Sequence, residues 1–184
     1  MKVLVFSASS RQGSLNKALS KIIDEKVRTA GFEVSFSEIK DYETALYDGD
    51  IENSQGVPLN AQKFKTLLDE HEAVVMVSPE YNFSTPGNLK NLIDWTSRTK
   101  QQPFRNKHIF LASASPSLVG GNRGLWSLRT PLSALGAHVY PDMFSLSLAH
   151  EAFTQDFKAL KDEKLTQSLE KLLNSFLKYA NKSL

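Results

Sequence analysis

Apolar residues along this chain recur with two periods, one typical of strands and one typical of helices. The apolar run at 73–77 is continuous, as in a strand that is buried on both faces of a parallel sheet. Residues 2–6 and 107–114 also predict strands. Residues 32–36 alternate apolar and polar side chains and predict an outer strand, and residues 137–140 predict a fifth strand.

Helical periodicity fills the intervals between these strands. Apolar residues recur every three or four positions in five segments, at about 14–30, 58–71, 86–97, 125–135 and 158–180. Thr85 and Pro86 predict the start of the third helix, as its N-cap and its first helical residue. Strands that alternate with helices form a doubly wound sheet with right-handed crossovers. No repeat or linker interrupts the alternation, so we expect one domain over residues 1–184.

Residues 37–57 follow neither period and are rich in acidic side chains. We expect a long loop there, without helix or strand. Loops of this length inside a compact domain are often functional. A hydrated acidic crossover is an equally good interpretation.

A polar loop of small residues, 7–16, follows the first strand. Ser9, Ser14 and Asn16 surround the start of a helix, where free backbone N–H groups and the helix dipole favour an anion. Arg11 adds a group that forms charge-assisted bonds to phosphate. The patterns GxxxxGK[ST] and GxGxxG are missing, which leaves a monophosphate site as the hypothesis. The alternative is simple N-capping of the helix by Ser14.

Two further polar loops follow the third and fourth strands. In the loop 79–86, backbone amides near Tyr81 and Asn82 are suited to hydrogen-bond a flat polar ring. The loop 113–124 contains Gly120 and Gly121, whose missing side chains let the backbone approach a ligand closely. The alternatives are ordinary packing of Tyr81 and a flexible turn at the two glycines.

The carboxyl ends of parallel strands meet at one edge of a sheet, so the three loops are expected to lie together. They follow strands one, three and four, which surround the switch point of the strand order 2-1-3-4-5. Flavin mononucleotide (FMN) binds at that point in the flavodoxin-like topology. The expected fold class is therefore α/β, a flavodoxin-like three-layer sandwich with a five-stranded parallel sheet between two layers of helices.

The composition excludes several classes of function. The chain has 22 basic and 20 acidic residues without a basic tract, so neither nucleic acid nor a membrane surface is indicated as a partner. It has no cysteine, which excludes disulfides, cysteine nucleophiles and thiolate metal sites and fits a cytoplasmic protein. No segment approaches the roughly 18 apolar residues of a membrane span.

Two motifs resemble those of the NADPH-dependent FMN reductase family, which includes chromate and quinone reductases and azoreductase-like enzymes. Residues 8–16 match the form G-S-x-R-x-x-S-x-N, except that Ala8 replaces the glycine. Residues 79–94 match the form P-E-Y-N-x-S-x-P-G-x-L-K-N-x-I-D without a break. A looser element with paired glycines resembles residues 120–137, although 115–117 lack a glycine that relatives often have there.

The resemblance implies bound FMN, with NADPH or NADH as the hydride donor. The first loop would hold the phosphate, the second would contact the isoalloxazine ring and the third would close its other side. The implied cofactor-binding residues are Ser9, Arg11, Ser14, Leu15, Asn16, Pro79, Glu80, Tyr81, Asn82, Ser113, Ser115 and Gly120. No side chain is implied to be catalytic, because the chemistry belongs to the flavin. Glu80 is expected to orient its neighbours or to reach an arginine such as Arg98 of a partner subunit.

The implied activity is hydride transfer from a nicotinamide to FMN and then to a quinone, a free flavin, an azo compound or a metal oxyanion. The resemblance also implies a homodimer or homotetramer, in which 37–57 and 97–106 would contact a partner subunit. One alternative is a flavodoxin-like electron carrier, although such carriers are strongly acidic. Another is a flavin-binding regulatory module.

Overall fold

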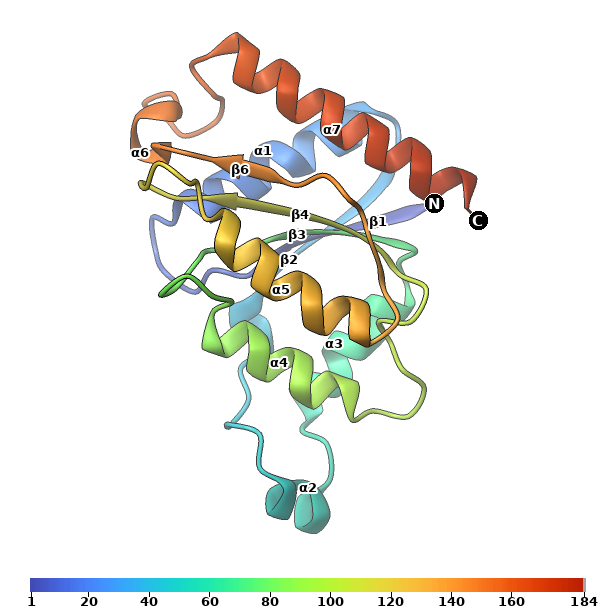
Figure 1. The fold of residues 1–184 in the computed structure, drawn as a ribbon. Coiled ribbons are helices and arrows are strands. Elements are labelled where there is room, and N and C mark those ends of the chain that lie inside the picture. Colours follow the sequence, from blue (N-terminus) through green and yellow to red (C-terminus); the bar gives the residue numbers. More distant parts are fainter. Residues whose placement is uncertain (184) are drawn as a thin grey trace.

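The computed structural model describes residues 1–183 and has three layers (Figure 1). A parallel sheet with the strand order β2-β1-β3-β4-β5 forms the middle layer, which confirms the predicted flavodoxin-like order. The strands are β1 (Lys2–Ser7), β2 (Glu33–Glu38), β3 (Ala73–Val77), β4 (His108–Ala114), β5 (His138–Val139) and β6 (Phe144–Leu146).

Helices cover both faces of the sheet. They are α1 (Leu15–Thr29), α2 (Gly49–Gln55), α3 (Leu59–Asp69), α4 (Gly87–Ser97), α5 (Asn122–Ala134), α6 (Ala149–Ala152) and α7 (Glu163–Lys182), with a 3-10 turn at Ile39–Tyr42. Helices α1 and α7 pack on one face, and α3, α4 and α5 pack on the other (Figure 1).

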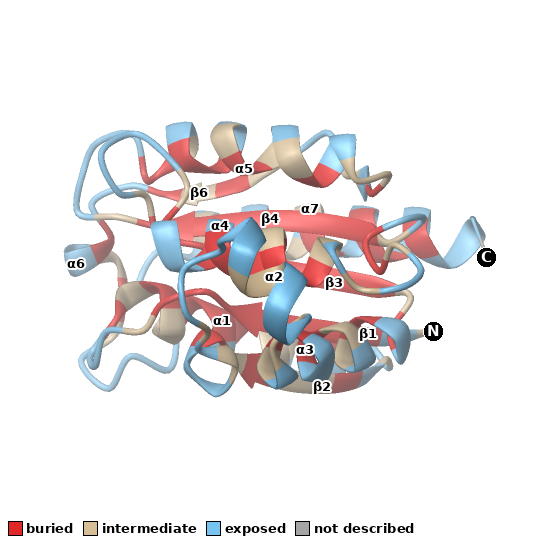
Figure 2. Cartoon of the chain, turned by 90° about the horizontal axis from the view of Figure 1, so that it is seen from below, coloured by how far each residue is buried: buried red, intermediate tan, exposed pale blue. Residues whose placement is uncertain are grey.

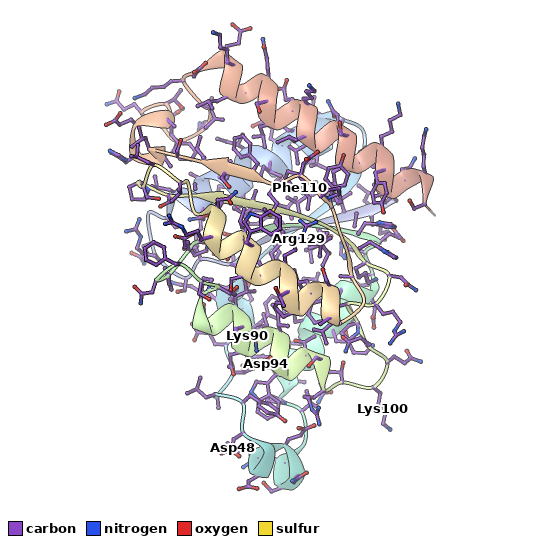
Figure 3. The ribbon with its side chains drawn as sticks, in the orientation of Figure 1. Asp48, Lys90, Asp94, Lys100, Phe110 and Arg129 are labelled. Atoms are coloured by element: carbon purple, nitrogen blue, oxygen red, sulfur yellow. The ribbon has the colours of Figure 1, made fainter. Side chains whose placement is uncertain are left out.

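The central strands are buried on both faces because successive side chains enter two separate cores. Val3 and Val5 of β1 pack in the core under α1 and α7, whereas Leu4 and Phe6 pack in the core under α3, α4 and α5. The strands in the middle of the molecule are accordingly buried along their length (Figure 2). Phe110, in the middle of β4, packs against Phe176 of α7 with the ring centroids 5.6 Å apart (Figure 3).

Helix α1, which borders the polar edge of the sheet, has well-defined ends. The Ser14 hydroxyl accepts hydrogen bonds from the N–H groups of Asn16 and Lys17, at 3.2 and 3.4 Å. This confirms the capping role of Ser14 that was one of the two interpretations of the first loop. Gly31, with φ of +89°, ends the helix, because glycine adopts this left-handed conformation without strain.

The fifth strand differs from the prediction of a strand at 137–140. Its place beside β4 is taken by two short strands, β5 against the start of β4 and β6 against its end. Pro141 lies between them, and proline has no N–H group to donate to a sheet. Arg129 of α5 covers the break by donating to the carbonyl oxygens of Val139 and Tyr140 (Figure 3).

The prediction of a structureless loop at 37–57 is wrong, because this segment contains the end of β2, the 3-10 turn and α2. Helix α2 projects away from the layers, and Asp48 precedes it and accepts a hydrogen bond from the N–H of Asp50 (Figures 1 and 3). No residue of α2 is buried, so this helix has no apolar period that the sequence could reveal. The segment that leads into α2 is attached to α4, because the Asn91 and Trp95 side chains both donate to the Ala45 carbonyl.

Two predicted helix starts are also corrected. Helix α4 begins at Gly87 with Pro86 as its N-cap, and the Thr85 hydroxyl donates to Ser127 of α5 instead of capping the helix. The last helix begins at Glu163 rather than near 158, with Asp162 as its cap. None of the helices within residues 1–183 combines the length and the apolarity that crossing a membrane requires.

His108 lies at the start of β4, at the edge of the sheet opposite the polar loops. It is 4% exposed, and its Nδ1 has no hydrogen-bond partner within residues 1–183. The His138 ring stacks on it with the centroids 5.2 Å apart, and Tyr179 of α7 packs edge-on against it. Burial, and to a smaller extent His138, lowers the pKa of His108.

We therefore expect the free energy of unfolding to decrease as the pH falls below about 6.5, the ordinary pKa of histidine. The unfolded chain then binds a proton that the buried His108 does not accept, so protonation favours unfolding. Above that pH both states are neutral at this residue and no such dependence remains. Urea unfolding on the two sides of this pH measures the effect. His108→Gln should remove part of the slope, and an unchanged slope in this variant would contradict the expectation.

Candidate functional site

A cavity of about 400 Å³ opens at the edge of the sheet where β1, β3 and β4 end. Its walls come from the three predicted loops and from one further segment. The lining residues are Ser9, Arg11, Ser14, Leu15, Asn16, Pro79, Glu80, Tyr81, Ala114, Ser115, Pro116 and His150. A hollow of about 470 Å³ between α1 and α7 is larger, but ligands of open α/β sheets bind beyond the carboxyl ends of the strands. We therefore take the loop-lined cavity as the candidate site.

The first loop presents unpaired hydrogen-bond donors to this cavity. The backbone N–H groups of residues 9–13 donate to no acceptor within residues 1–183. Ser9 is only 3% exposed, yet its hydroxyl also lacks a hydrogen-bond partner in the described part of the chain. Arg11 is exposed and pairs with no carboxylate among these residues. Together with the start of α1, these groups form a cradle for an anion.

Asn16 lines the cavity, but its side-chain amide forms two hydrogen bonds within the protein. Its Nδ2 donates to the Ala114 carbonyl at 2.8 Å, and its Oδ1 accepts from the Ala114 N–H at 2.9 Å. The N–H of Ser78, just after β3, still reaches β4 at the Ala112 carbonyl, but β3 has ended before it can pair with Ala114. Asn16 therefore replaces the missing strand partner and ties the first loop to the third.

The second loop contains a two-residue turn between Tyr81 and Ser84. The two residues exchange backbone hydrogen bonds, both at 3.0 Å, across Asn82 and Phe83. Asn82 and Phe83 have φ of 48° and 63°, the positive values that a type I′ turn requires. Tyr81 lines the cavity and is 49% exposed, whereas Asn82 lies on the turn and is not part of the cavity wall.

Glu80 fixes the second loop to α5. Its Oε2 accepts a hydrogen bond at 2.7 Å from the N–H of Gly124, in the first turn of the helix, where the helix dipole favours a carboxylate. A Cβ at Gly124 would lie 2.9 Å from the Cβ of Glu80, so only glycine permits this approach. Arg98, the candidate partner of Glu80 across a subunit boundary, binds Glu52 within its own chain at 2.9 Å.

The third loop contributes Ala114, Ser115 and Pro116 to the cavity wall. Ser113 is fully buried, and its hydroxyl donates to the Gly120 carbonyl, so these two residues support the loop from behind and do not line the cavity. The structure thus brings nine of the predicted residues together and places Asn82, Ser113 and Gly120 outside the wall.

The cavity wall also contains three residues that the sequence did not predict, Ala114, Pro116 and His150. The two loop residues lie directly beside Ser115, which was named. His150 belongs to α6 and reaches the cavity because β6 pairs with the end of β4. Both elements are too short to produce a periodic pattern, so no signal in the sequence indicated this segment. No cluster of three potential metal ligands occurs among residues 1–183.

The chemistry of the cavity fits FMN. Its volume lies in the roughly 300–1,000 Å³ range of small-molecule sites. The unpaired N–H groups, the Ser9 hydroxyl and Arg11 suit a phosphate. Two parts of the cavity wall, the half-exposed Tyr81 and residues 114–116, are suited to contact a flat ring.

Comparison with known proteins identifies the family. The family model for NADPH-dependent FMN reductase matches residues 1–151. A quinone reductase from Escherichia coli (strain K12) is 35% identical over 140 residues, which are 76% of this chain and 73% of that protein. An NAD(P)H-dependent FMN reductase from Pseudomonas aeruginosa is 32% identical over 179 residues, which are 94% of this chain and 93% of the relative.

A solved structure agrees with these relatives. The flavoenzyme NAD(P)H:(acceptor) oxidoreductase from Paracoccus denitrificans has a TM-score of 0.81 and 25% identity, and the match covers 98% of this chain and 97% of that one. The resemblance that the two motifs indicated is confirmed, as are an oxidoreductase activity and the FMN and nicotinamide cofactors. This chain belongs to the NADPH-dependent FMN reductase family.

Proposed function

We propose that this protein is an NAD(P)H-dependent FMN reductase of the quinone reductase type. It takes two electrons from a nicotinamide and delivers them to a small-molecule acceptor, with a quinone as the first choice because several relatives are named quinone reductase. The observation that carries the proposal is that one cavity combines the anion-binding first loop with the second and third loops, whose residues can lie against a flat ring. We propose that residues 1–184 form a single domain around this site.

The first loop is suited to hold the phosphate of FMN. Its backbone N–H groups at 9–13 have no competing acceptor within the described residues, and the guanidinium of Arg11 is free to pair with the anion. Asn16 has one side-chain N–H left after its two bonds to Ala114, so its main role is to hold the first and third loops at a set spacing.

The second and third loops are suited to hold the isoalloxazine ring. FMN, when bound, supplies the redox chemistry, accepting a hydride from the nicotinamide and passing the electrons on. Glu80 is held by the Gly124 N–H and keeps the ring wall in place, so we assign it no proton transfer. The exposure of Tyr81 leaves an open side through which donor and acceptor can alternate.

We infer further that the protein assembles as a homodimer or homotetramer. The segment around α2 supports this, since it stands away from the layers and has no buried residue in its helix (Figure 1). Leu46, at its base, is 80% exposed and offers an apolar side chain for such a contact. Together with the 97–106 connection it offers a contact surface for a second copy. Sedimentation velocity gives the mass in solution and tests this assembly.

The function is tested by an absorption spectrum of the purified protein, followed by anaerobic addition of NADPH and then of a quinone. We expect a flavin spectrum that bleaches with NADPH and returns with the quinone. Bleaching without steady turnover would favour the electron carrier, and a colourless protein that does not bind added FMN would refute the proposal.

Arg11→Gln is expected to weaken FMN binding by about tenfold, the effect of one charge-assisted bond at an accessible site. The free energy of unfolding should stay within about 0.5 kcal/mol of the natural chain, because Arg11 contacts no carboxylate in the described structure. Titration with FMN and urea unfolding measure the two quantities. Unchanged affinity for FMN would mean that the phosphate lies elsewhere.

A further inference from the structure

His150 is the one residue of the cavity wall that lies beyond all three predicted loops. It is the second residue of α6, a single helical turn that follows β6. Among the lining residues of the described chain, only Arg11 and His150 have side chains that can carry a positive charge. Neither motif of the sequence includes it.

The position of His150 is set by two backbone hydrogen bonds from the preceding residues to the third loop. Ala149 N–H donates to the Ser115 carbonyl at 3.0 Å, and Leu148 N–H donates to the Ser117 carbonyl at 3.1 Å. Leu148 adopts φ of 45°, a strained value for a residue with a side chain. The chain therefore turns sharply at Leu148 and places His150 at the cavity instead of continuing along the sheet.

The charged and titratable groups around His150 come from three elements. On its own helix, Glu151 Oε1 lies 3.3 Å from His150 Nε2, with both side chains more than half exposed to solvent. The first loop brings Arg11, and the second brings Glu80 and Tyr81. Glu80 already accepts the Gly124 N–H. The third loop, at 115–117, consists of serines and a proline and adds no titratable group.

We propose that His150 is a further contact of the flavin phosphate, complementing Arg11 and the N–H groups of the first loop. This inference rests on the proposed function. A histidine gains its positive charge between about pH 8 and 5. An imidazolium then donates a charge-assisted hydrogen bond to a phosphate, whose own second ionisation lies near pH 6. The contribution of His150 to FMN affinity should consequently grow as the pH falls.

The test compares FMN with riboflavin, which has the same ring system and lacks the phosphate. The natural chain and the His150→Gln variant are titrated with each flavin at about pH 6 and about pH 8.5, which lie on the two sides of histidine titration. We expect the variant to bind FMN about tenfold more weakly at the lower pH and within about twofold at the higher pH. Riboflavin affinity should differ less than about twofold at either pH. The phosphate ionises equally in both proteins, so the ratio of their affinities isolates the imidazole.

His138→Gln is the matched control, since it removes another exposed imidazole at the opposite edge of the sheet. It should leave both flavin affinities unchanged. Equal losses for FMN and riboflavin in His150→Gln, or a loss for FMN that is the same at both pH values, would overturn the assignment to the phosphate. Failure of the natural chain to bind FMN would overturn the proposed function as well, so the two failures are distinguishable.

Discussion

Gly120→Ala should destabilise the protein by about 3 kcal/mol and prevent tight FMN binding, since it combines overpacking with a strained backbone. A Cβ at this position would lie 2.8 Å from the Ser145 carbonyl carbon, 2.8 Å from the Ser147 nitrogen and 2.9 Å from the Leu146 carbonyl carbon. All three are backbone atoms, so no side-chain rotation relieves the collision. Gly120 also has φ of +63°, a conformation that alanine adopts at a cost.

The effect should reach the site because the backbone beside Gly120 cannot move independently. Strand β6 pairs with β4, and the Leu146 carbonyl accepts the N–H of Ser115, a residue of the cavity wall. Displacing β6 therefore displaces the third loop and the α6 turn together. Urea unfolding and FMN titration measure the two losses.

Gly31→Ala is the matched control for this substitution. Gly31 has φ of +89°, but a Cβ there would meet no atom of residues 1–183 within 4 Å. Its replacement should cost about 1 kcal/mol, the strain of the left-handed conformation alone, and should leave FMN affinity unchanged. Equal destabilisation by the two variants would show that the contact with β6 contributes nothing.

Asn16→Ala is expected to lower the free energy of unfolding by about 3 kcal/mol, because it leaves two buried backbone groups unpaired. The N–H and carbonyl of Ala114 would lose their partners, and Ala114 is only 3% exposed. Since Ala114 lines the cavity, FMN binding should weaken by at least about tenfold as the first and third loops separate.

Asn16→Asp separates the effect of the hydrogen bonds between Asn16 and Ala114 from the effect of charge at this position. An aspartate can still accept the Ala114 N–H, but its second oxygen faces the Ala114 carbonyl and adds a negative charge beside the phosphate cradle. It should therefore weaken FMN binding more than riboflavin binding. Asn60→Ala, which removes one exposed hydrogen bond to Glu43, is the control and should change stability by less than about 1 kcal/mol. If Asn16→Ala lowers the free energy of unfolding no more than Asn60→Ala does, Asn16 does not hold the first and third loops together.

Several elements were predictable because their signal is local. The continuous apolar run of β3 predicted a strand buried on both faces, residues 2–6 predicted a second strand, and the structure places both in the centre of the sheet. The polar loops after them were predicted to share one edge, and nine of the named residues do line one cavity there. By contrast, α2, β6 and α6 have no period of their own, since α2 buries nothing and the other two are three and four residues long.

The sequence revealed the types of residue at the site, but it did not reveal which of their polar groups lack a hydrogen-bond partner inside the protein. Ser9 and Asn16 both carry groups that bind phosphate, and both lie in the same motif. In the structure Ser9 has no partner among the described residues, whereas Asn16 is occupied by Ala114. Glu80 was expected to orient its neighbours or to reach an arginine of a partner subunit, and in the fold its carboxylate accepts the Gly124 N–H.

The sequence alone determined the layered parallel fold, the edge of the sheet at which the three polar loops meet and the family, because burial periodicity and motif spacing are properties of neighbouring residues. Only the tertiary structure decided which polar groups remain free and that His150 joins them. A hydrogen-bond partner can come from anywhere in the chain: Asn16 and Ala114 are 98 residues apart. The freedom of a side chain is therefore a property of the packed molecule.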